Sequence, residues 1–141
     1  MAVVCDTGGV YALYDADDDH HEAVTAVVEA EPGAIFLPTV RLAEIDYLLN
    51  ERLGVDATLD FLASVESGAF TLVDLTSEDL PRCRELVHRY RDLPLGLADA
   101  SVIATAERLR LQRILTLDQR HFRTVKPSLF THFVLLPADL D

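Results

Sequence analysis

The chain has 141 residues, of which half are hydrophobic, and its 24 acidic and 12 basic residues give a net charge of −12. This length predicts one domain, residues 1–141, with a hydrophobic core of its own. The composition excludes a disordered chain, and the negative charge argues against a general nucleic-acid binder, because phosphate contacts need Lys and Arg. Six of the basic residues nevertheless lie together, between Arg108 and Lys126.

The sequence carries no sign of a membrane segment or of secretion. No apolar run approaches the length of a membrane span, and the N-terminus lacks the basic region of a signal peptide. The two cysteines, Cys5 and Cys83, are isolated, which favours free thiols in a reducing compartment. We therefore expect a cytoplasmic protein without a membrane partner.

Apolar runs of strand length alternate with segments of helical periodicity along the chain. In chain order, we expect a strand at 2–5, a helix at 7–14, an acidic loop at 15–19, a helix at 20–31, a strand at 34–37, and helices at 40–52 and 55–66. There follow a strand at 70–73, a helix capped at 77–79 that runs to about 91, a helix opened by Gly96, a strand at 113–117, a turn or helix at 119–122 and a strand at 133–136. Because the strands are short, continuously apolar and joined by no hairpin signal, they predict an α/β fold with a parallel sheet of about five strands, flanked by helices on both faces.

Four acidic residues occupy corresponding places in this pattern. Asp6 ends the first strand, and Asp118 ends the fourth. Glu44 lies early in the helix after the second strand, and Asp99 lies in the first turns of the helix opened by Gly96. The carboxyl ends of parallel strands and the amino ends of the following helices share one edge of the sheet. We therefore expect all four carboxylates to face one pocket.

Clustered carboxylates repel one another, and a divalent cation removes this conflict. Oxygen ligands suit Mg²⁺ or Mn²⁺, and two such ions roughly 4 Å apart can promote hydrolysis of a phosphodiester bond. The residue types do not distinguish one ion from two. Thr7 and Thr116 are placed to hydrogen-bond the carboxylates or a water molecule at the ion. Arg120 and Arg123, close to Asp118 in sequence, are candidates to hold a phosphate backbone.

Each acid also has a purely structural interpretation. Asp6 and Asp118 lie at strand-to-helix turns, where an aspartate commonly caps the helix. Asp99 in a first turn favours the helix dipole whether or not it binds an ion. The direction of Glu44 is undecided from the sequence, and Asp46 competes for its role. The placement of four acids on one edge favours the functional interpretation of the set.

Short motifs around these acids resemble the PIN-domain family and, within it, the VapC-type toxins of bacterial toxin–antitoxin pairs. The resemblance rests on an ordered set of four segments: Val3-Val4-Cys5-Asp6-Thr7, Leu42-Ala43-Glu44-Ile45, Leu97-Ala98-Asp99-Ala100 and Leu115-Thr116-Leu117-Asp118-Gln119-Arg120-His121-Phe122. Each segment alone is a weak signal, whereas their order and spacing, from Val3 to about Val134, are fairly specific.

The resemblance implies a Mg²⁺- or Mn²⁺-dependent endoribonuclease with a PIN-like fold. Asp6, Glu44, Asp99 and Asp118 match the acidic quartet of the family, with Thr116 as its frequent hydroxyl neighbour. The resemblance further implies a cognate VapB-type antitoxin that covers the site, and a homodimer of the toxin. The acidity of the whole chain makes a narrow, structured RNA target more plausible than general degradation.

Two other classes compete with this interpretation. A phosphorylation-receiver domain is also an acidic, Mg²⁺-binding α/β fold, and Asp74 and the pair Lys126-Pro127 resemble parts of one. It would, however, want adjacent acids after the first strand, where Thr7 follows Asp6. A catalytically silent PIN-type binding module is the second class, and the intact quartet argues against it. His88, His121 and His132 are scattered and no Ser or Cys lies beside a base, so a nucleophile triad has no support.

Overall fold

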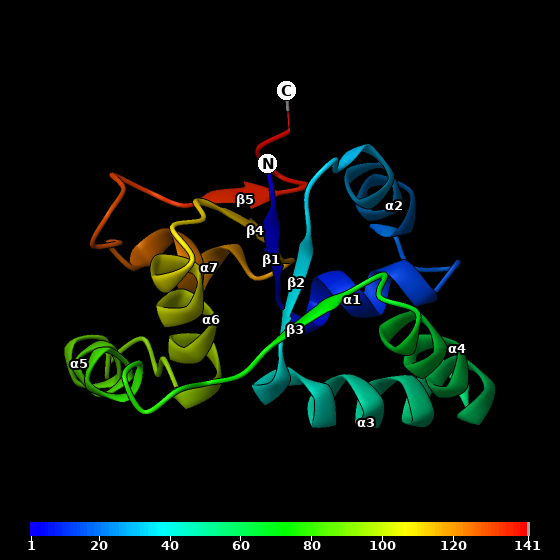
Figure 1. Ribbon diagram of the computed structural model, residues 1–141, viewed down its shortest axis with the longest axis horizontal. Coiled ribbons are helices and arrows are strands. Elements are labelled where there is room, and N and C mark those ends of the chain that lie inside the picture. The colour runs from blue at the N-terminus through cyan, green and yellow to red at the C-terminus, as the bar shows by residue number, and fades with distance from the viewer. Residues whose placement is uncertain (141) are drawn as a thin grey trace.

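The computed structural model describes residues 1–140, which form one five-stranded parallel sheet with helices on both faces (Figure 1). The strands are β1 (Val3–Cys5), β2 (Ile35–Pro38), β3 (Thr71–Val73), β4 (Arg113–Leu115) and β5 (Val134–Leu136). Their order across the sheet is β3-β2-β1-β4-β5, and all four pairings are parallel. The predicted fold class is therefore confirmed.

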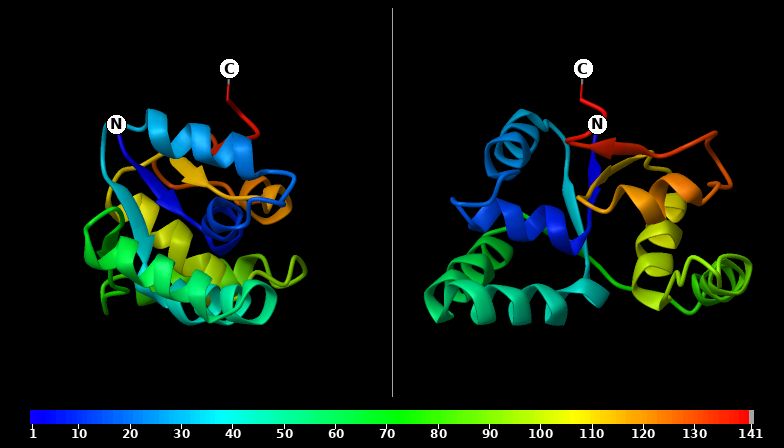
Figure 2. Two further views of the ribbon diagram at one scale, coloured as in Figure 1. Left: turned by 90° about the vertical axis from the view of Figure 1, so that its right-hand side faces the viewer. Right: turned by 180° about the vertical axis from the view of Figure 1, so that it is seen from behind.

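The helices divide into two groups, one on each face of the sheet (Figures 1 and 2). One face carries α1 (Thr7–Tyr14), α2 (His21–Ala30), α3 (Leu42–Leu53) and α4 (Val55–Glu66). The other carries α5 (Leu80–Arg89), α6 (Leu97–Arg108) and α7 (Gln119–Thr124). A short 3-10 turn, η1 (Thr39–Arg41), joins β2 to α3.

Each face has its own hydrophobic core, and β1 separates the two. Val3 and Cys5 point into the core beneath α1–α4, whereas Val4 points into the core beneath α5–α7. This alternation follows from the pleat, since successive side chains of a strand point to opposite faces. Fully buried side chains such as Phe61 on one face and Phe122 on the other fill the two cores. All three residues of β1 are completely buried, as expected for a central strand.

Several predicted boundaries differ from the structure by one or two residues. The predicted strand at 113–117 ends at Leu115, and the helix expected at 40–52 begins as the 3-10 turn η1 before α3. The helix expected to reach about 91 ends at Arg89. The first difference matters for the site, because it places Thr116 and Asp118 in the connection after β4 rather than in the strand.

A glycine allows the first helix to lie directly against β4. A Cβ atom at Gly9 would lie 2.7 Å from the carbonyl oxygen of Leu115, which is too close for any side chain. Gly9 therefore permits α1 to begin beside the end of β4. The close approach brings Asp6, just before α1, next to Thr116.

Both cysteines are buried and free, in agreement with the predicted reduced thiols. Burial raises the pKa of the Cys5 thiol, and the neighbouring Asp6 carboxylate raises it further, so Cys5 remains a protonated core residue. Among the described residues, no helix combines the length and the apolar character needed to cross a membrane.

Candidate active site

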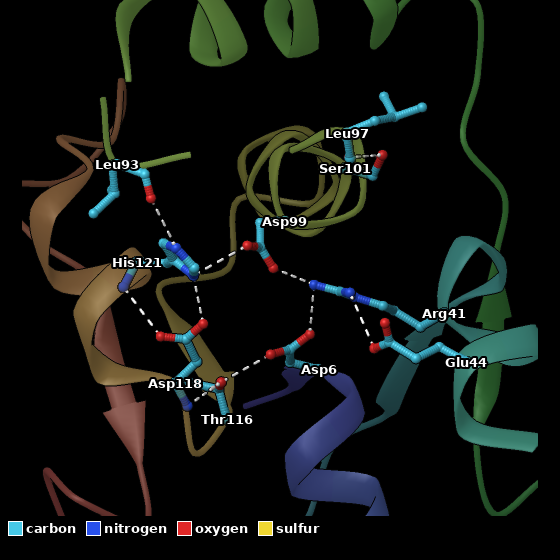
Figure 3. A network of polar contacts seen from close by, with 10 residues as sticks. All are labelled: Asp6, Arg41, Glu44, Leu93, Leu97, Asp99, Ser101, Thr116, Asp118 and His121. Atoms are coloured by element: carbon cyan, nitrogen blue, oxygen red, sulfur yellow. Dashed lines mark hydrogen bonds and ion pairs between the residues drawn. The ribbon is translucent and has the colours of Figure 1, made fainter. Parts of the chain in front are cut away.

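Asp6 lies at the carboxyl end of β1 and is 5% exposed. It occupies the N-cap position of α1, but its side chain makes no capping hydrogen bond. The Thr116 hydroxyl instead donates to Asp6 Oδ2 at 3.0 Å. Asp6 Oδ1 lies 2.9 Å from Arg41 Nη2 and accepts no hydrogen bond from the described residues. The capping interpretation of Asp6 is therefore wrong, and its carboxylate turns into the site (Figure 3).

Asp99 lies in the first turn of α6 and faces two cations from different parts of the chain. Its Oδ1 accepts a hydrogen bond from Arg41 Nη2. Its Oδ2 lies 3.2 Å from Nδ1 of His121. Arg41 and His121 thus approach the carboxylate from opposite sides (Figure 3).

Asp118 combines a structural role with a place in the site. It precedes α7, and its Oδ1 accepts a capping hydrogen bond from the backbone N–H of His121 at 3.1 Å. Its other oxygen, Oδ2, lies 2.5 Å from His121 Nδ1. The backbone N–H of Asp118 donates to the Thr116 hydroxyl at 3.0 Å, so Thr116 links the Asp118 loop to Asp6.

Glu44 lies in the first turn of α3, and its half-exposed carboxylate is 3.3 Å from Arg41 Nη1. It lines the same cavity as the three aspartates, with a volume of about 470 Å³. Asp46 is exposed on the same helix and does not line this cavity. The structure thus gathers all four predicted acids, together with Thr7, around one cavity, and it gives Glu44 rather than Asp46 the place beside them.

Arg41 and His121 belong to this cluster, and neither was identified from the sequence as a site residue. Arg41 stands three residues before Glu44, and His121 stands three residues after Asp118. Spacing of this kind places side chains on neighbouring positions of a helix. This three-residue spacing from an acid is the one feature of the sequence that points to Arg41 and His121 as neighbours of the acidic cluster. In the sequence His121 is only one of three scattered histidines, whereas the structure places it against two carboxylates.

Burial and neighbouring charges raise the pKa values of both Asp6 and His121, for different reasons. Burial raises the pKa of Asp6 and the Asp99 charge adds to this, while Arg41, the Thr7 backbone N–H and Thr116 oppose it without cancelling it. Burial lowers the pKa of His121, but the Asp118 hydrogen bond and the charges of Asp118 and Asp99 outweigh it, so the net shift is upward.

The contacts of the His121 ring agree with its raised pKa. Nδ1 faces the Asp118 carboxylate, and Nε2 lies 3.1 Å from the backbone carbonyl oxygen of Leu93. Both partners are acceptors, and both contacts favour the protonated ring, which is the same direction as the raised pKa. When it is protonated, His121 is a counter-charge for Asp118 and Asp99.

The donor set fits a divalent cation. Asp99, Asp118 and His121 each offer one ligand atom, and these atoms lie within 4.8 Å of one another. Asp6, whose Oδ1 contacts Arg41, and the buried Thr7 hydroxyl line the same cavity, and the hydroxyl has no hydrogen-bond partner in residues 1–140. Buried polar atoms are rarely left unpaired, and carboxylate oxygens are the ligands that Mg²⁺ and Mn²⁺ prefer.

The two predicted phosphate contacts differ in their surroundings. Arg123 donates to Asp139 at 2.6 Å and to Gln119 at 3.0 Å, so its charge is already paired. Arg120 is exposed, and its guanidinium has no ion-pair partner in the part of the chain that the structure describes. Contact with RNA remains a prediction for both residues.

The residues that suggested a receiver domain lie in ordinary structural contacts. Asp74 follows β3, the edge strand of the sheet, and accepts a hydrogen bond from the Thr39 hydroxyl at 2.9 Å. The backbone N–H of Lys126 donates to the Tyr90 hydroxyl at 3.0 Å. Neither Asp74 nor Lys126 lines the acidic cavity.

The fold and the acidic site together define a PIN-domain protein, and comparisons with known proteins agree. Residues 3–127 match the PIN domain family. The chain is 33% identical over 135 residues to ribonuclease VapC26 of Mycobacterium tuberculosis (strain ATCC 25618 / H37Rv), covering 96% of this chain and 100% of that protein. The chain therefore belongs to the PIN-domain family and, within it, to the VapC-type proteins, as its motifs indicate.

Solved structures confirm the fold at lower identity. The Mycobacterium tuberculosis toxin VapC20, described as cleaving the sarcin–ricin loop, is 22% identical with a TM-score of 0.77, and the match covers 84% of this chain and 92% of that one. FitAcB from Neisseria gonorrhoeae matches with a TM-score of 0.67 at 16% identity, over 86% and 91% of the two chains. VapBC2 from Rickettsia felis, bound to a promoter DNA fragment, has a TM-score of 0.67 at 14% identity, over 89% and 93%.

Proposed function

We propose that this protein is a divalent-metal-dependent endoribonuclease that hydrolyses RNA phosphodiester bonds, and that it is the toxin of a VapBC-type toxin–antitoxin pair. The observation that carries the proposal is the convergence of Asp6, Glu44, Asp99 and Asp118 on one cavity in a VapC-type chain. Four carboxylates around one cavity repel one another, and Arg41 offsets only part of their charge, so a metal ion is favourable there. Mg²⁺ is the proposed ion, and Mn²⁺ is an alternative of similar chemistry.

Asp99 and Asp118 are the proposed ligands of the metal, and Asp6 and Glu44 complete the acidic wall of the cavity around it. When bound, the metal supplies an activated water and stabilises the leaving oxygen of the phosphodiester. Thr116 holds the Asp6 carboxylate and the Asp118 loop in position through its two hydrogen bonds. The Thr7 hydroxyl, which has no partner among the described residues, is available to the ion or its water.

We propose structured RNA as the substrate. The net charge of −12 disfavours unspecific attraction to nucleic acid, so recognition must come from local positive groups and shape. Arg120, two residues after Asp118 and in the first turn of α7, is exposed and free to contact a phosphate, and Arg123 follows three residues later. VapC20, which has the same fold, cleaves a defined RNA loop, and this supports a narrow target.

Two exposed apolar surfaces support protein partners, for which we propose a VapB-type antitoxin and a second copy of the chain. Tyr47 on α3 and Val55 and Leu59 on α4 are more than half exposed. Leu80 on α5 and Leu97 on α6 are about half exposed and line a groove of about 680 Å³. Large exposed apolar side chains are common at interfaces. The structural relatives FitAcB and VapBC2 support an antitoxin partner.

The proposed activity is tested by incubating the purified protein with total cellular RNA in Mg²⁺ or Mn²⁺ and in chelator. The wild type is expected to yield discrete fragments only with metal, and Asp99→Asn is expected to yield none. Asp46→Asn is the matched control, because Asp46 is an exposed acid of α3 that does not line the cavity. Cleavage that Asp99→Asn leaves unchanged would contradict the site assignment. A folded, metal-binding wild type that cleaves no RNA would favour a silent binding module.

A further inference from the structure

Arg41 places a fixed positive charge among the proposed metal ligands. It ends η1, at the carboxyl end of β2, and its side chain is 6% exposed. Nη2 contacts Oδ1 of Asp6 at 2.9 Å and donates to Oδ1 of Asp99. Nη1 lies 3.3 Å from Oε1 of Glu44 (Figure 3). One guanidinium therefore contacts three of the four acids.

The oxygens that Arg41 contacts are those that a cation shared by these three acids would need. Asp6, Glu44 and Asp99 converge on the guanidinium from different elements, β1, α3 and α6. A divalent ion placed between the same oxygens would lie against the guanidinium and be repelled by it. Arg41 and a metal ion thus compete for this half of the cavity.

Burial keeps Arg41 in place. The polar contacts of its side chain within residues 1–140 are these three carboxylates, and Nε has no hydrogen-bond partner. If the guanidinium were displaced by a metal ion, it would lose its counter-charges while remaining enclosed. An unpaired buried charge is strongly unfavourable. The free-energy cost of leaving the Arg41 guanidinium unpaired would therefore exceed the gain from binding a metal ion to carboxylates that Arg41 already neutralises.

The other half of the cavity stays open to a metal ion. Asp118 and Oδ2 of Asp99 make no contact with Arg41, and they face His121 instead. Asp99, Asp118 and His121 are also the residues whose ligand atoms lie within 4.8 Å of one another. An ion there would lie between these three side chains, away from the Arg41 guanidinium.

We propose that Arg41 is the permanent cation of the Asp6–Glu44 side of the site, and that it limits the protein to one divalent ion, bound on the Asp99–Asp118 side. The inference rests on the proposed metal-dependent function. The net charge of the site is consistent with one ion. The four carboxylates and Arg41 together carry a net charge of −3, and one divalent ion reduces this to −1. A second ion would make the cluster positive.

The test is the number of Mn²⁺ ions bound per chain, measured by equilibrium dialysis and by the electron paramagnetic resonance of bound Mn²⁺. The wild type and Arg41→Lys are expected to bind one ion without spin coupling. Arg41→Gln is expected to bind two spin-coupled ions, with affinity for the first raised at least about tenfold because a charge within a few ångströms is removed. Arg84→Gln is the control, since Arg84 is an exposed arginine on α5 outside the acidic cavity.

The outcomes separate this inference from the proposed function. Two ions per wild-type chain, or one ion in a folded Arg41→Gln, would overturn the role of Arg41 while leaving a metal-dependent nuclease intact. A wild type that binds no Mn²⁺ would remove the metal from the proposed function itself. If Arg41→Gln does not fold, as judged by circular dichroism, the counts for the wild type and Arg41→Lys still decide the question.

Discussion

Each end of α6 holds a buried or largely buried acid against an arginine. The two clusters differ in how many partners the carboxylate and the arginine have. At the C-terminal end, Glu107 accepts from Arg82 Nε at 2.8 Å, from Arg82 Nη2 at 2.9 Å and from the Ser128 backbone N–H at 2.7 Å. At the N-terminal end, Arg41 serves Asp99 and two further acids at once.

The pKa values record the difference. Burial alone would raise the pKa of Glu107, but the hydrogen bonds from Arg82 and Ser128 outweigh it and lower the pKa. Asp6 shows the opposite, because burial outweighs its partners and its pKa is raised. A paired carboxylate with all its oxygens satisfied stabilises the fold, whereas a carboxylate left short of partners is ready for a ligand. The first cluster is a structural ion pair, and the second is the candidate active site.

The largest effect on stability is expected at Glu107. Glu107→Gln leaves the buried part of Arg82 without its bidentate partner, which should reduce the free energy of unfolding by about 3 kcal/mol. RNA cleavage per folded molecule should not change, because Glu107 does not line the acidic cavity. Urea denaturation measures the first quantity and a cleavage assay below the unfolding transition measures the second. Loss of cleavage in folded Glu107→Gln would contradict the assignment of the Glu107 cluster as purely structural.

Asp6→Asn should show the reverse pattern. Cleavage is expected to fall at least about 100-fold, since loss of even an outer partner of a metal ligand commonly costs 10- to 100-fold. The metal-free melting temperature should stay level or rise, because the substitution removes a buried charge whose raised pKa marks it as unfavourable. A large fall in melting temperature with intact cleavage would show that Asp6 is structural.

The pH dependence of stability offers a smaller but more specific comparison. Glu107 has a lowered pKa when folded, so its contribution is complete above its ordinary pKa of 4.5 and is lost as the pH falls through the lowered value. Asp6 has a raised pKa, so its protonation on acidification favours the folded state. In Glu107→Gln, the free energy of unfolding should therefore fall less steeply as the pH is lowered into the acid range. In Asp6→Asn, it should fall more steeply over the same range. Equal curves for both variants would contradict the assigned shifts.

The smallest effect separates two neighbouring arginines of α7. Arg120→Gln should lower the salt dependence of kcat/KM by about one unit of logarithmic slope, as expected for one phosphate contact. Arg123→Gln should change it less, because Asp139 already neutralises the Arg123 charge. The slopes come from cleavage rates measured over a series of salt concentrations. A larger change for Arg123 would mean that RNA displaces the ion pair with Asp139.

The sequence carried enough information for the sheet and for the four acids. Short apolar strands alternating with helices left few arrangements, and in a parallel sheet Asp6 and Asp118 must then meet at one edge with the helix starts. The convergence of Glu44 and Asp99 follows from the same topology. Glu44 could not be separated from Asp46 by periodicity, because both are exposed positions flanking the buried Ile45 of α3.

The two cations of the site depend on information that periodicity does not contain. Arg41 reaches an acid 58 positions away, and its direction is set by the short turn η1 rather than by α3. His121 turns inward because Asp118 both caps α7 and holds its ring. Such contacts arise from packing between elements, so a single sequence indicates the residues only as neighbours of an acid.

The position of Mn²⁺ in a crystal of the wild type, located by anomalous scattering, tests the central claim most directly. The account predicts a peak in the acidic cavity, within coordination distance of Asp99 and Asp118, with Arg41 still against Asp6. A peak outside this cavity, or none at Mn²⁺ concentrations that support cleavage, would contradict the assignment of these carboxylates as the metal site.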